Sequence, residues 1–556
     1  MSAAIFFHPE AYTTSGPKLM GRNAAGESFL RGFLEHATFG EEDPIVVQLL
    51  QHSHAVDFEA LAQKHGRSNQ IHSVTTHNFQ DLAKASTVYY PGPNLSEHAY
   101  KRRLLGDEKW SLCGITHTTS SAKAMDAIAE IITAPVQTWD ALICTSTAVK
   151  SNVEVILQAQ ADELQSRLGA TRLVLPKLPI IPLGIHTDDF EFTNQHREIS
   201  RDELGVDNNT LVVLYTGRLS FHAKANPFAM YTALESAAKK TEKTLVLVEC
   251  GWHSNDYIRE AFKEGAREFA PSIRVINLDG RVERNRKISW SGSDIFCSLS
   301  DNIQETFGIV PIEAMAAGMP VVVSDWDGYK DSVRDGVDGF RIPTLAPGPG
   351  LGGDLAFRHA LEIDSYDLYC GHSSSLVAVD LDALTKAFVT LVNSPELRRT
   401  MGESGKRRAR EYYDWETIIK TYESLWGELA ELRKGSQSKD TVNKPPKPQK
   451  WPARLDPTTS FSNYPTRQLG LETKFCRTET DITKAIARYK KISKLKMFSY
   501  ASLVFLSDQE LNIVLSSASS EPKFASELIS SISAKRKPYV LRSLAFLTKI
   551  GLLRSA

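Results

Sequence analysis

Two glutamates eight positions apart, Glu305 and Glu313, offer the most specific chemistry in this sequence. They lie in the run ETFGIVPIEAMAAG, where Glu305 precedes a predicted helix and Glu313 falls inside it. The free backbone N–H groups of Phe307, Gly308 and Ile309 come just before that helix. Helix N-termini attract anions, and a glycine lets a ligand approach the backbone closely. The run therefore predicts an anion-binding site flanked by two carboxylates.

Two successive runs of alternating strands and helices would position these residues. Strands separated by helices indicate βαβ units and parallel sheets. Fully apolar strands such as LVVL and PVVVS fit sheets that are covered on both faces. We therefore predict an α/β fold with two doubly wound, Rossmann-like domains. Ligands of such sheets bind outside the carboxyl ends of the strands, here in a cleft between the two domains. The candidate strands are 4–7, 45–50, 112–115, 141–145, 179–182, 210–215, 244–249, 273–277, 294–298 and 320–324.

Five segments are expected along the 556 residues. Their predicted bounds are 1–195 for the first Rossmann-like domain, 196–395 for the second, 396–433 for a helical stretch, 434–459 for a basic Pro-rich linker, and 460–556 for a small, mainly helical domain that faintly resembles a winged helix. An insertion at 344–376 interrupts the second domain. Its Gly/Pro-rich start, APGPGLGG, could cradle phosphate, but a mobile surface loop is favoured, because no strand precedes it and no P-loop lysine follows.

Composition excludes several classes of protein. With 42% hydrophobic and 24% charged residues the chain is globular, and its net charge of −1 argues against a globally cationic nucleic-acid binder. Six cysteines without a CxxC pair argue against a disulfide framework or a zinc ribbon, and favour buried thiols. The N-terminus has no basic region typical of a signal peptide, and no run approaches about 18 apolar residues. We expect a cytoplasmic protein, with peripheral contact to the inner face of a membrane left open.

Several motifs together resemble retaining GT-B glycosyltransferases, in particular glycosyltransferase family four. ETFGIVPIEAMAAGMPVV resembles the E-x7-E signature of that family, YTGRLSFHAK its phosphate-binding segment, and EYYDWETIIKTYESLW its terminal helix, which crosses back to the first domain. The resemblance covers roughly residues 1–432. It implies an acceptor domain followed by a nucleotide-sugar donor domain.

The resemblance implies roles for four charged residues. Arg218 and Lys224 match the pair that neutralises the donor diphosphate, where a leaving group gains charge in the transition state. Lys224 lies one position further from the arginine than the family spacing. Glu313 matches the carboxylate that accepts from the ribose hydroxyls. Glu305 matches the acid beside the transferred sugar.

Further donor contacts are implied on three loops. Phe307, Gly308 and Ile309 would offer N–H groups to sugar and phosphate, and Arg281 with Val282, after Gly280, matches the loop that meets the base. His117 in GITHTT matches a sugar-contacting histidine. Gly21 and Gly26 lie in the expected loop between the first strand and the first helix, where this chain has GRNAAGE in place of the family's Gly-Gly.

The implied reaction is sugar transfer with retention of anomeric configuration. Two carboxylates could suggest a double displacement, but the E-x7-E acids match donor contacts. We therefore expect the departing phosphate to deprotonate the acceptor hydroxyl. Asp325-Trp326-Asp327 resembles a metal-binding D-x-D motif, yet it is interpreted as a turn at Asp327-Gly328. No metal and no cofactor is expected.

Partners other than the donor stay open, as do the donor sugar, its base and the acceptor. The basic-apolar stretch 100–105 with Trp110 could touch an anionic membrane that carries a lipid-linked acceptor, or it could be a solvated helix face. Residues 460–556, with Lys535, Arg536 and Lys537, could read DNA, but a docking or oligomerisation module is favoured. The alternative functions are another GT-B enzyme, such as a phosphorylase or an epimerase, and a non-catalytic scaffold.

Overall fold

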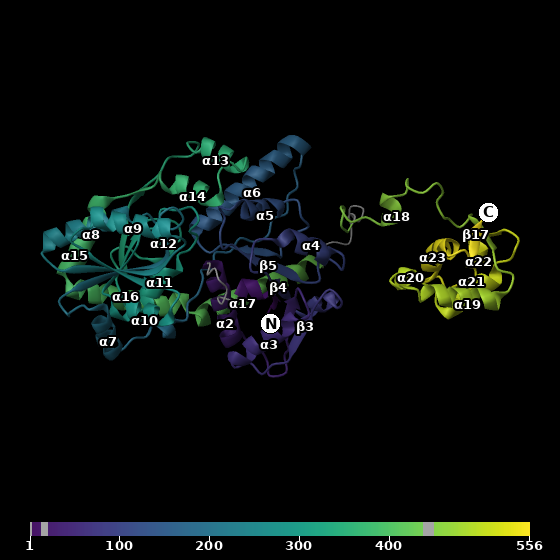
Figure 1. Cartoon of the computed structure of the whole chain (residues 1–556), viewed down its shortest axis with the longest axis horizontal. Coiled ribbons are helices and arrows are strands. Elements are labelled where there is room, and N and C mark those ends of the chain that lie inside the picture. The colour runs from purple at the N-terminus through teal and green to yellow at the C-terminus, as the bar shows by residue number, and fades with distance from the viewer. Residues whose placement is uncertain (1–2, 13–20, 438–449) are drawn as a thin grey trace. The chain divides into compact units, whose positions relative to one another are not determined.

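The computed structural model describes residues 3–12, 21–437 and 450–556 (Figure 1). The chain divides into two compact units, Met1–Trp451 and Pro452–Ala556. The division falls within the predicted basic linker 434–459, of which residues 438–449 lie outside the described part.

The first domain is built on a six-stranded parallel sheet with the order β3-β2-β1-β4-β5-β6. Its strands are β1 (Ala4–Phe7), β2 (Ile45–Leu49), β3 (Ile71–Val74), β4 (Thr87–Tyr89), β5 (Ser111–Ile115) and β6 (Ala141–Ile143). Its helices are α1 (Pro9–Tyr12), α2 (Gly21–His36), α3 (His54–Lys64), η1 (Phe79–Lys84), α4 (Leu95–Arg103), α5 (Ala122–Glu130) and α6 (Thr147–Leu168). The candidate strand at 179–182 forms only isolated bridges, such as Cys144 with Ile180.

The second domain repeats the plan with the order β12-β11-β10-β7-β8-β9, again parallel. Its strands are β7 (Leu211–Leu219), β8 (Leu245–His253), β9 (Arg274–Asp279), β10 (Ile295–Ser298), β11 (Val321–Ser324) and β12 (Gly339–Ile342). Between and around them lie η2 (Thr187–Phe190), α7 (Asn194–Leu204), α8 (Phe228–Thr241), α9 (Asp256–Phe269), α10 (Glu283–Gly292), α11 (Ile309–Ala316), α12 (Tyr329–Ser332) and α15 (Leu381–Asn393).

Alternation along β7 shows why its sequence is apolar throughout. Leu211 and Val213 point into the core under α8, α9 and α15, whereas Val212 and Leu214 point into the core that includes α10 and α11. Because both faces of the sheet are covered, both sets of side chains are buried. Together with the extra helical C-terminal region, the two sheets confirm the predicted fold class.

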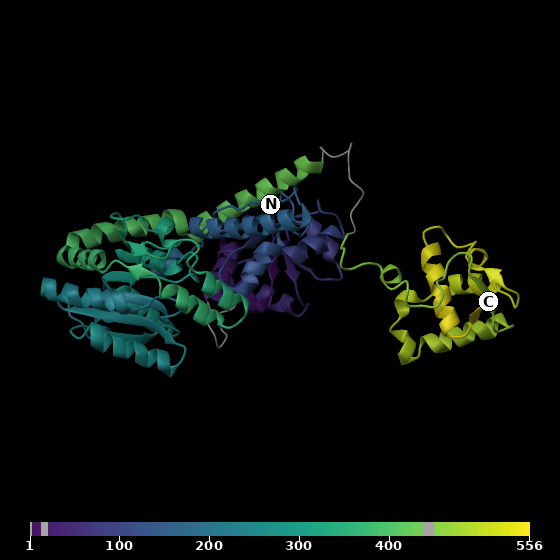
Figure 2. The ribbon, with the colours of Figure 1, turned by 90° about the horizontal axis from the view of Figure 1, so that it is seen from above.

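Helix α17 (Trp415–Gln437) follows α16 (Pro395–Tyr413) and packs on the first domain, against α2, β4 and β5 (Figure 1). Trp415 is the anchor of this crossing and is completely buried. A Cβ on Gly32 or on Gly184 would lie 2.5 Å from the Trp415 ring, so only glycine fits at either position. Helix α17 thereby completes the core of the first domain. Figure 2 shows the same helix along its length.

Residues 100–105 and Trp110 were considered as an exposed stretch that touches a membrane or solvent, and this is wrong for Arg102 and Trp110. Trp110 is 1% exposed, and Arg102 is fully buried in a pair with Asp140, with N–O distances of 2.5 and 2.8 Å. Their neighbours Leu104 and Leu105 do remain exposed. Among the helices of the described ranges, none is long and apolar enough to cross a membrane.

The insertion and the second unit have structure of their own. The insertion at 344–376 forms β13 (Thr344–Leu345), α13 (Gly353–Ala360) and α14 (Tyr366–Ser374), and β14 (Ala378–Val379) follows it. The second unit adds an antiparallel sheet, β16-β15-β17, to its helices. Its elements are α18 (Pro457–Ser460), β15 (Lys474–Arg477), α19 (Ile482–Ser493), α20 (Lys496–Ser499), η3 (Ser502–Val504), α21 (Asp508–Ser517), β16 (Lys523–Phe524), α22 (Ala525–Leu528), α23 (Lys537–Lys549) and β17 (Leu553–Ser555). Arg536 of the predicted basic patch is paired with Glu510 at 2.7 Å.

Candidate functional site

Two basic residues, Arg218 at the end of β7 and Lys224 in the loop after it, meet the loop that follows β10. Arg218 donates from Nη2 to Gln304 Oε1 at 2.9 Å, and Lys224 Nζ lies 3.2 Å from Glu305 Oε2. β7 and β10 are neighbours in a parallel sheet, so both loops leave from the same edge. Three of the predicted site residues therefore form one cluster. Its two cations and one carboxylate leave an excess of positive charge, which suits an anionic group.

The turn before α11 is built around Gly308. Its φ of 75° is in the left-handed region, and a Cβ there would lie 1.8 Å from Cε1 of Tyr329. Only glycine satisfies both conditions. Gly308 is the N-cap residue of α11 and offers no side chain to the first turn, so the backbone N–H groups there are left for a ligand or water. Phe307 itself is buried, and Ile309 is the first helical residue.

Glu313 lies one turn into α11 and faces a residue that the sequence did not single out. Burial raises the pKa of Glu313 to about 7, opposed by the positive charge of Arg286. Arg286, in α10, donates from Nη1 to Gly280 O at 2.8 Å. It therefore links the predicted base-contacting loop to the predicted ribose-contacting acid. Its only sequence signal is its place six residues after that loop's glycine.

The predicted base-contacting residues lie on the loop after β9, at the edge of the second sheet. Arg281 is paired with Asp279, with Nη2 to Oδ2 at 2.7 Å, and this pairing holds the pKa of Asp279 below its usual range. Val282 is 47% exposed. Val282 is thus open to a ligand, whereas the Arg281 guanidinium is already engaged.

His117 of the first domain is brought next to Glu305 through Thr306. Thr306 Oγ1 donates to the His117 backbone carbonyl at 3.2 Å, and Ser146 Oγ donates to the Thr306 carbonyl at 2.7 Å. His117 follows β5 and Ser146 follows β6, so the strand ends of the first sheet meet the glutamate loop of the second. The structure therefore brings His117, Glu305, Arg218 and Lys224 together.

Gly21 and Gly26 are not in an open loop, as the sequence predicted, but in α2. Gly21 is its first residue, and a Cβ on Gly26 would lie 2.1 Å from the Ala11 carbonyl oxygen. The physical reason for Gly26 is thus the close approach of α1 to α2. Residues 13–20, part of the predicted acceptor-side loop, lie outside the described residues.

Asp327 was interpreted as part of a surface turn, but its side chain contacts residues of the candidate site. The turn itself is present, since Tyr329 N donates to Trp326 O at 3.1 Å. However, Asp327 is half-buried, its φ is 43°, and it lies 3.3 Å from Ser146 Oγ. Burial, and then the charge of Glu305, raises the pKa of Asp327 to about 8. Asp327 therefore lies among the groups that join the two domains.

The insertion, of which only the Gly/Pro-rich start was interpreted as a mobile surface loop, reaches the same place through α14. Tyr366 OH and Ser120 Oγ of the first domain are 2.8 Å apart. A Cβ on Gly371 would lie 3.1 Å from Cβ of His222, which sits between Arg218 and Lys224 in the chain. The later part of the insertion, for which the sequence predicted no role, therefore packs onto the candidate site through α14. Composition gave no signal of this, since the contacts join residues far apart in the sequence.

A family model matches much of the second domain. Residues 196–346 match the family model described as "Glycosyl transferases group 1". The second domain is similar to group 1 glycosyltransferases. The matched stretch contains Arg218, Lys224, Glu305 and Glu313.

Individual relatives are more distant. The chain is 24% identical over 293 residues to a D-inositol 3-phosphate glycosyltransferase of Corynebacterium glutamicum (strain R). This match spans 51% of this chain and 60% of that protein. The chain is 32% identical over 159 residues to a phosphatidyl-myo-inositol mannosyltransferase of Mycobacterium leprae (strain TN), over 28% and 33% of the two chains. The matches thus span 60% or less of these relatives. The crystal structure of Anabaena HepE in complex with UDP aligns with a TM-score of 0.49 at 16% identity, over 77% of this chain and 100% of that one.

Proposed function

We propose that this protein is a retaining glycosyltransferase that moves a sugar from a nucleoside-diphosphate sugar to a hydroxyl acceptor. One observation carries the proposal: Arg218, Lys224 and Glu305 converge from the end of β7 and the loops after β7 and β10, in a domain that matches group 1 glycosyltransferases. Thr306, next to Glu305, joins this cluster to the backbone carbonyl of His117 in the first domain. The relatives are named glycosyltransferases and a mannosyltransferase, which agrees with sugar transfer.

In the proposed donor complex, the diphosphate lies beside Arg218 and Lys224. Both cations and the N–H groups at the start of α11 oppose the negative charge that grows on the leaving diphosphate. Because Lys224 contacts Glu305 at 3.2 Å, a bound phosphate shares Lys224 with that carboxylate. Glu313, ionised, accepts from the ribose hydroxyls, and Arg286 favours that ionised form.

In the proposed chemical step, the C–O bond between the sugar and the diphosphate breaks while the acceptor oxygen attacks from the same face. The acceptor proton passes to the departing phosphate oxygen, so no protein carboxylate forms a covalent intermediate. Glu305 is placed beside the transferred sugar and His117 on the acceptor side. No metal is assigned a part in this step, because the cations and the helix N-terminus already supply positive charge.

Calorimetry and thermal shift against nucleoside diphosphates and their sugars, mannose donors included, test the donor site. One ligand should bind selectively to the wild-type protein, and Arg218→Ala should abolish its binding. Arg259→Ala is the matched control, because Arg259 is a surface arginine of α9 paired only with neighbouring acids. Equal binding by the Arg218 and Arg259 variants would refute the assignment. An inverted product anomer would refute retention, and a sugar trapped on Glu305 would refute the same-face mechanism.

A further inference from the structure

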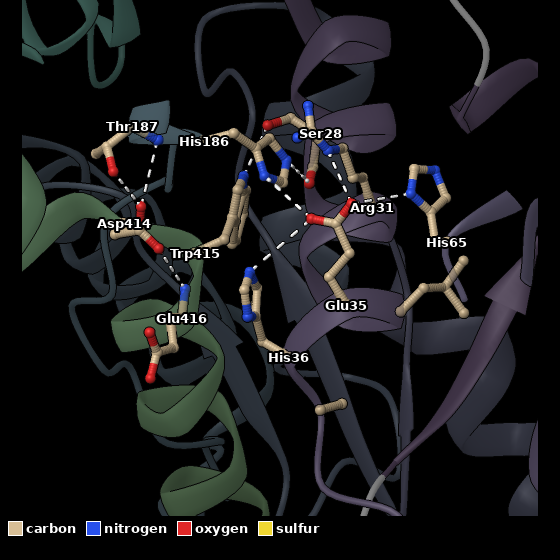
Figure 3. A network of polar contacts seen from close by, with 12 residues as sticks. Ser28, Arg31, Glu35, His36, His65, His186, Thr187, Asp414, Trp415 and Glu416 are labelled. Atoms are coloured by element: carbon tan, nitrogen blue, oxygen red, sulfur yellow. Dashed lines mark hydrogen bonds and ion pairs between the residues drawn. The ribbon is translucent and has the colours of Figure 1, made fainter. Parts of the chain in front are cut away.

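A cluster of imidazoles surrounds Glu35 away from the glycosyltransferase-like site (Figure 3). Glu35 and His36 end α2, His65 follows α3, and His186 precedes η2. The four residues come from three stretches of the first unit that are far apart in the sequence. They play no part in the proposed sugar transfer, so the proposal below does not depend on it.

One oxygen of Glu35 is fully engaged. Glu35 Oε1 lies 3.0 Å from His65 Nδ1 and 3.1 Å from Arg31 Nε. Arg31 is in turn paired with Asp189 at 2.6 Å, so its charge is shared between two carboxylates. Burial raises the pKa of Glu35, but the hydrogen bonds from Arg31 and His65 outweigh this effect and hold that pKa below its usual range. Glu35 is therefore a carboxylate whose orientation is fixed by two donors.

The other oxygen of Glu35 meets two imidazole nitrogens at distances too long for good hydrogen bonds. Glu35 Oε2 lies 3.5 Å from His186 Nδ1 and 3.9 Å from His36 Nε2. One ligand atom from each of Glu35, His36 and His186 lies within 4.8 Å of the other two. In a tetrahedral zinc site with bonds of about 2.0–2.1 Å, neighbouring ligand atoms are about 3.3 Å apart. The separations exceed this distance by at most about 1.5 Å, so side-chain adjustments of that size would suffice.

The hydrogen bonding of His186 decides which of its nitrogens faces Glu35 Oε2 with a lone pair. His186 Nε2 lies 3.2 Å from the Ser28 carbonyl, which can only accept, so the proton is on Nε2. In the neutral form of the ring, which is the form that binds metals, the Nδ1 lone pair is turned toward the Glu35 carboxylate. Two such acceptors repel each other unless a cation lies between them.

We propose that Glu35 Oε2, His36 Nε2 and His186 Nδ1 bind a divalent transition metal, of which Zn²⁺ suits this N₂O ligand set best. The Ser28 carbonyl orients His186, and His65 with Arg31 orients Glu35, as outer-shell partners do in metal sites. The Glu35 and His36 side chains are 28% and 30% exposed, so solvent supplies the fourth ligand and the path of entry.

The metal would join three parts of the fold. Ser28, whose carbonyl holds His186, also accepts from the Trp415 indole through its hydroxyl at 2.7 Å. Trp415 begins α17, and Asp414 before it accepts from Thr187 Oγ1 at 2.5 Å. A metal between His36 and His186 would therefore pin α2 to the segment that leads into the second domain. It acts as a structural clamp.

Calorimetric titration of the full-length, chelator-treated protein with ZnCl₂ tests the site. We expect one equivalent to bind and to raise the Tm. His36→Ala and His186→Ala should each weaken binding about 100-fold or more, and His65→Ala about tenfold, since outer-shell losses cost about 10–100-fold. His72→Ala is the matched control and should bind as wild type, because His72 contacts a carboxylate, Asp81, without belonging to the cluster.

Cobalt substitution separates this site from adventitious binding. Co²⁺ should give the visible bands of a four-coordinate site, without the charge-transfer band of a thiolate. A thiolate band, no binding at all, or equal affinity in the wild type and the His36→Ala variant would each overturn the proposal. His36 is partly exposed, so its alanine variant keeps the fold even where the His186 variant does not.

Discussion

Arg102 and Arg103 are neighbours in α4, yet their surroundings are opposite, and this makes a sharp test of the structure. Arg102 and Asp140 are both 0% exposed, whereas Arg103 and Asp107 are 21% and 30% exposed. Asp140 also accepts from the backbone N–H groups of Leu112 and Gln137, each at 2.8 Å. Arg102 therefore belongs to a buried network and Arg103 to a surface pair.

Replacing each arginine by methionine keeps the apolar stem and removes the charge. Arg102→Met leaves the Asp140 carboxylate buried without its partner, which costs about 3–5 kcal/mol. Arg103→Met removes a surface pair worth at most about 1 kcal/mol. For a domain of about 150–250 residues, 1 kcal/mol corresponds to about 2–4 °C in Tm. Arg102→Met should lower the Tm by about 6–20 °C, and Arg103→Met by no more than about 4 °C.

Scanning calorimetry of the full chain at one scan rate, at neutral pH and fixed salt, measures both variants. Raising the salt concentration should change the effect of Arg103→Met and leave that of Arg102→Met nearly unchanged, because buried pairs are screened little. Two small and equal shifts would show that Arg102 is at the surface. That result would refute the placement of α4 and restore residues 100–105 as an exposed basic stretch.

Three further predictions concern the site and its domain. Gly308→Ala should abolish nucleotide binding, because its Cβ would meet Tyr329 at 1.8 Å, whereas Gly318→Ala, also at positive φ but in open space, should cost only about 1 kcal/mol of stability. Tyr366→Phe should lower transfer about fivefold by removing one hydrogen bond worth about 1 kcal/mol, while Tyr369→Phe on the same helix should not. Glu249 is buried, so Glu249→Gln should reduce the change of unfolding free energy with pH. Glu264 is exposed, so Glu264→Gln should leave that change as it is in the wild type.

The sign of the Glu249 effect follows from its raised pKa. Burial raises the pKa of Glu249 to about 7, against its ordinary value of 4.5. Between these values the folded chain binds more protons than the unfolded chain, so stability falls as pH rises through this window, by at most about 1.4 kcal/mol per pH unit. Denaturant unfolding from pH 4.5 to 7 measures the slope. A slope in Glu249→Gln as steep as in wild type would contradict the burial of this acid.

Unimpaired nucleotide binding by Gly308→Ala would count against the site geometry. Equal transfer rates for Tyr366→Phe and Tyr369→Phe would count against it in the same way.

Much of the fold follows from local patterns. The strand at 210–215 is apolar at every position because both faces of its sheet are covered, and the structure extends it to Leu219. The short strands β3 and β4 were missed, because three or four residues carry little periodic signal. The segment 179–182 was predicted as a strand from its apolar residues, but it pairs with β6 only through isolated bridges.

The candidate site was predictable where one short segment carries it. Glu305, Gly308 and Glu313 follow from a single run, because the turn and helix start they need are local. The cluster of Arg218 and Lys224 with Glu305 was expected only from the family resemblance, and the structure supplies its distances. Arg286 and Tyr366 were missed, and Asp327 was interpreted only as part of a turn, because their partners lie 27, 246 and 181 residues away in the chain.

The sequence by itself determined the alternation of strands and helices, the two Rossmann-like domains and the glutamate motif, because period, apolarity and glycine placement act over a few residues. The tertiary structure alone decided which of two adjacent arginines is buried, that α14 of the insertion packs onto the site, and that Glu35 meets His36, His65 and His186. Each of these depends on which strand ends and helices are neighbours. That is set by the packing of segments far apart in the chain, about which local periodicity carries no information.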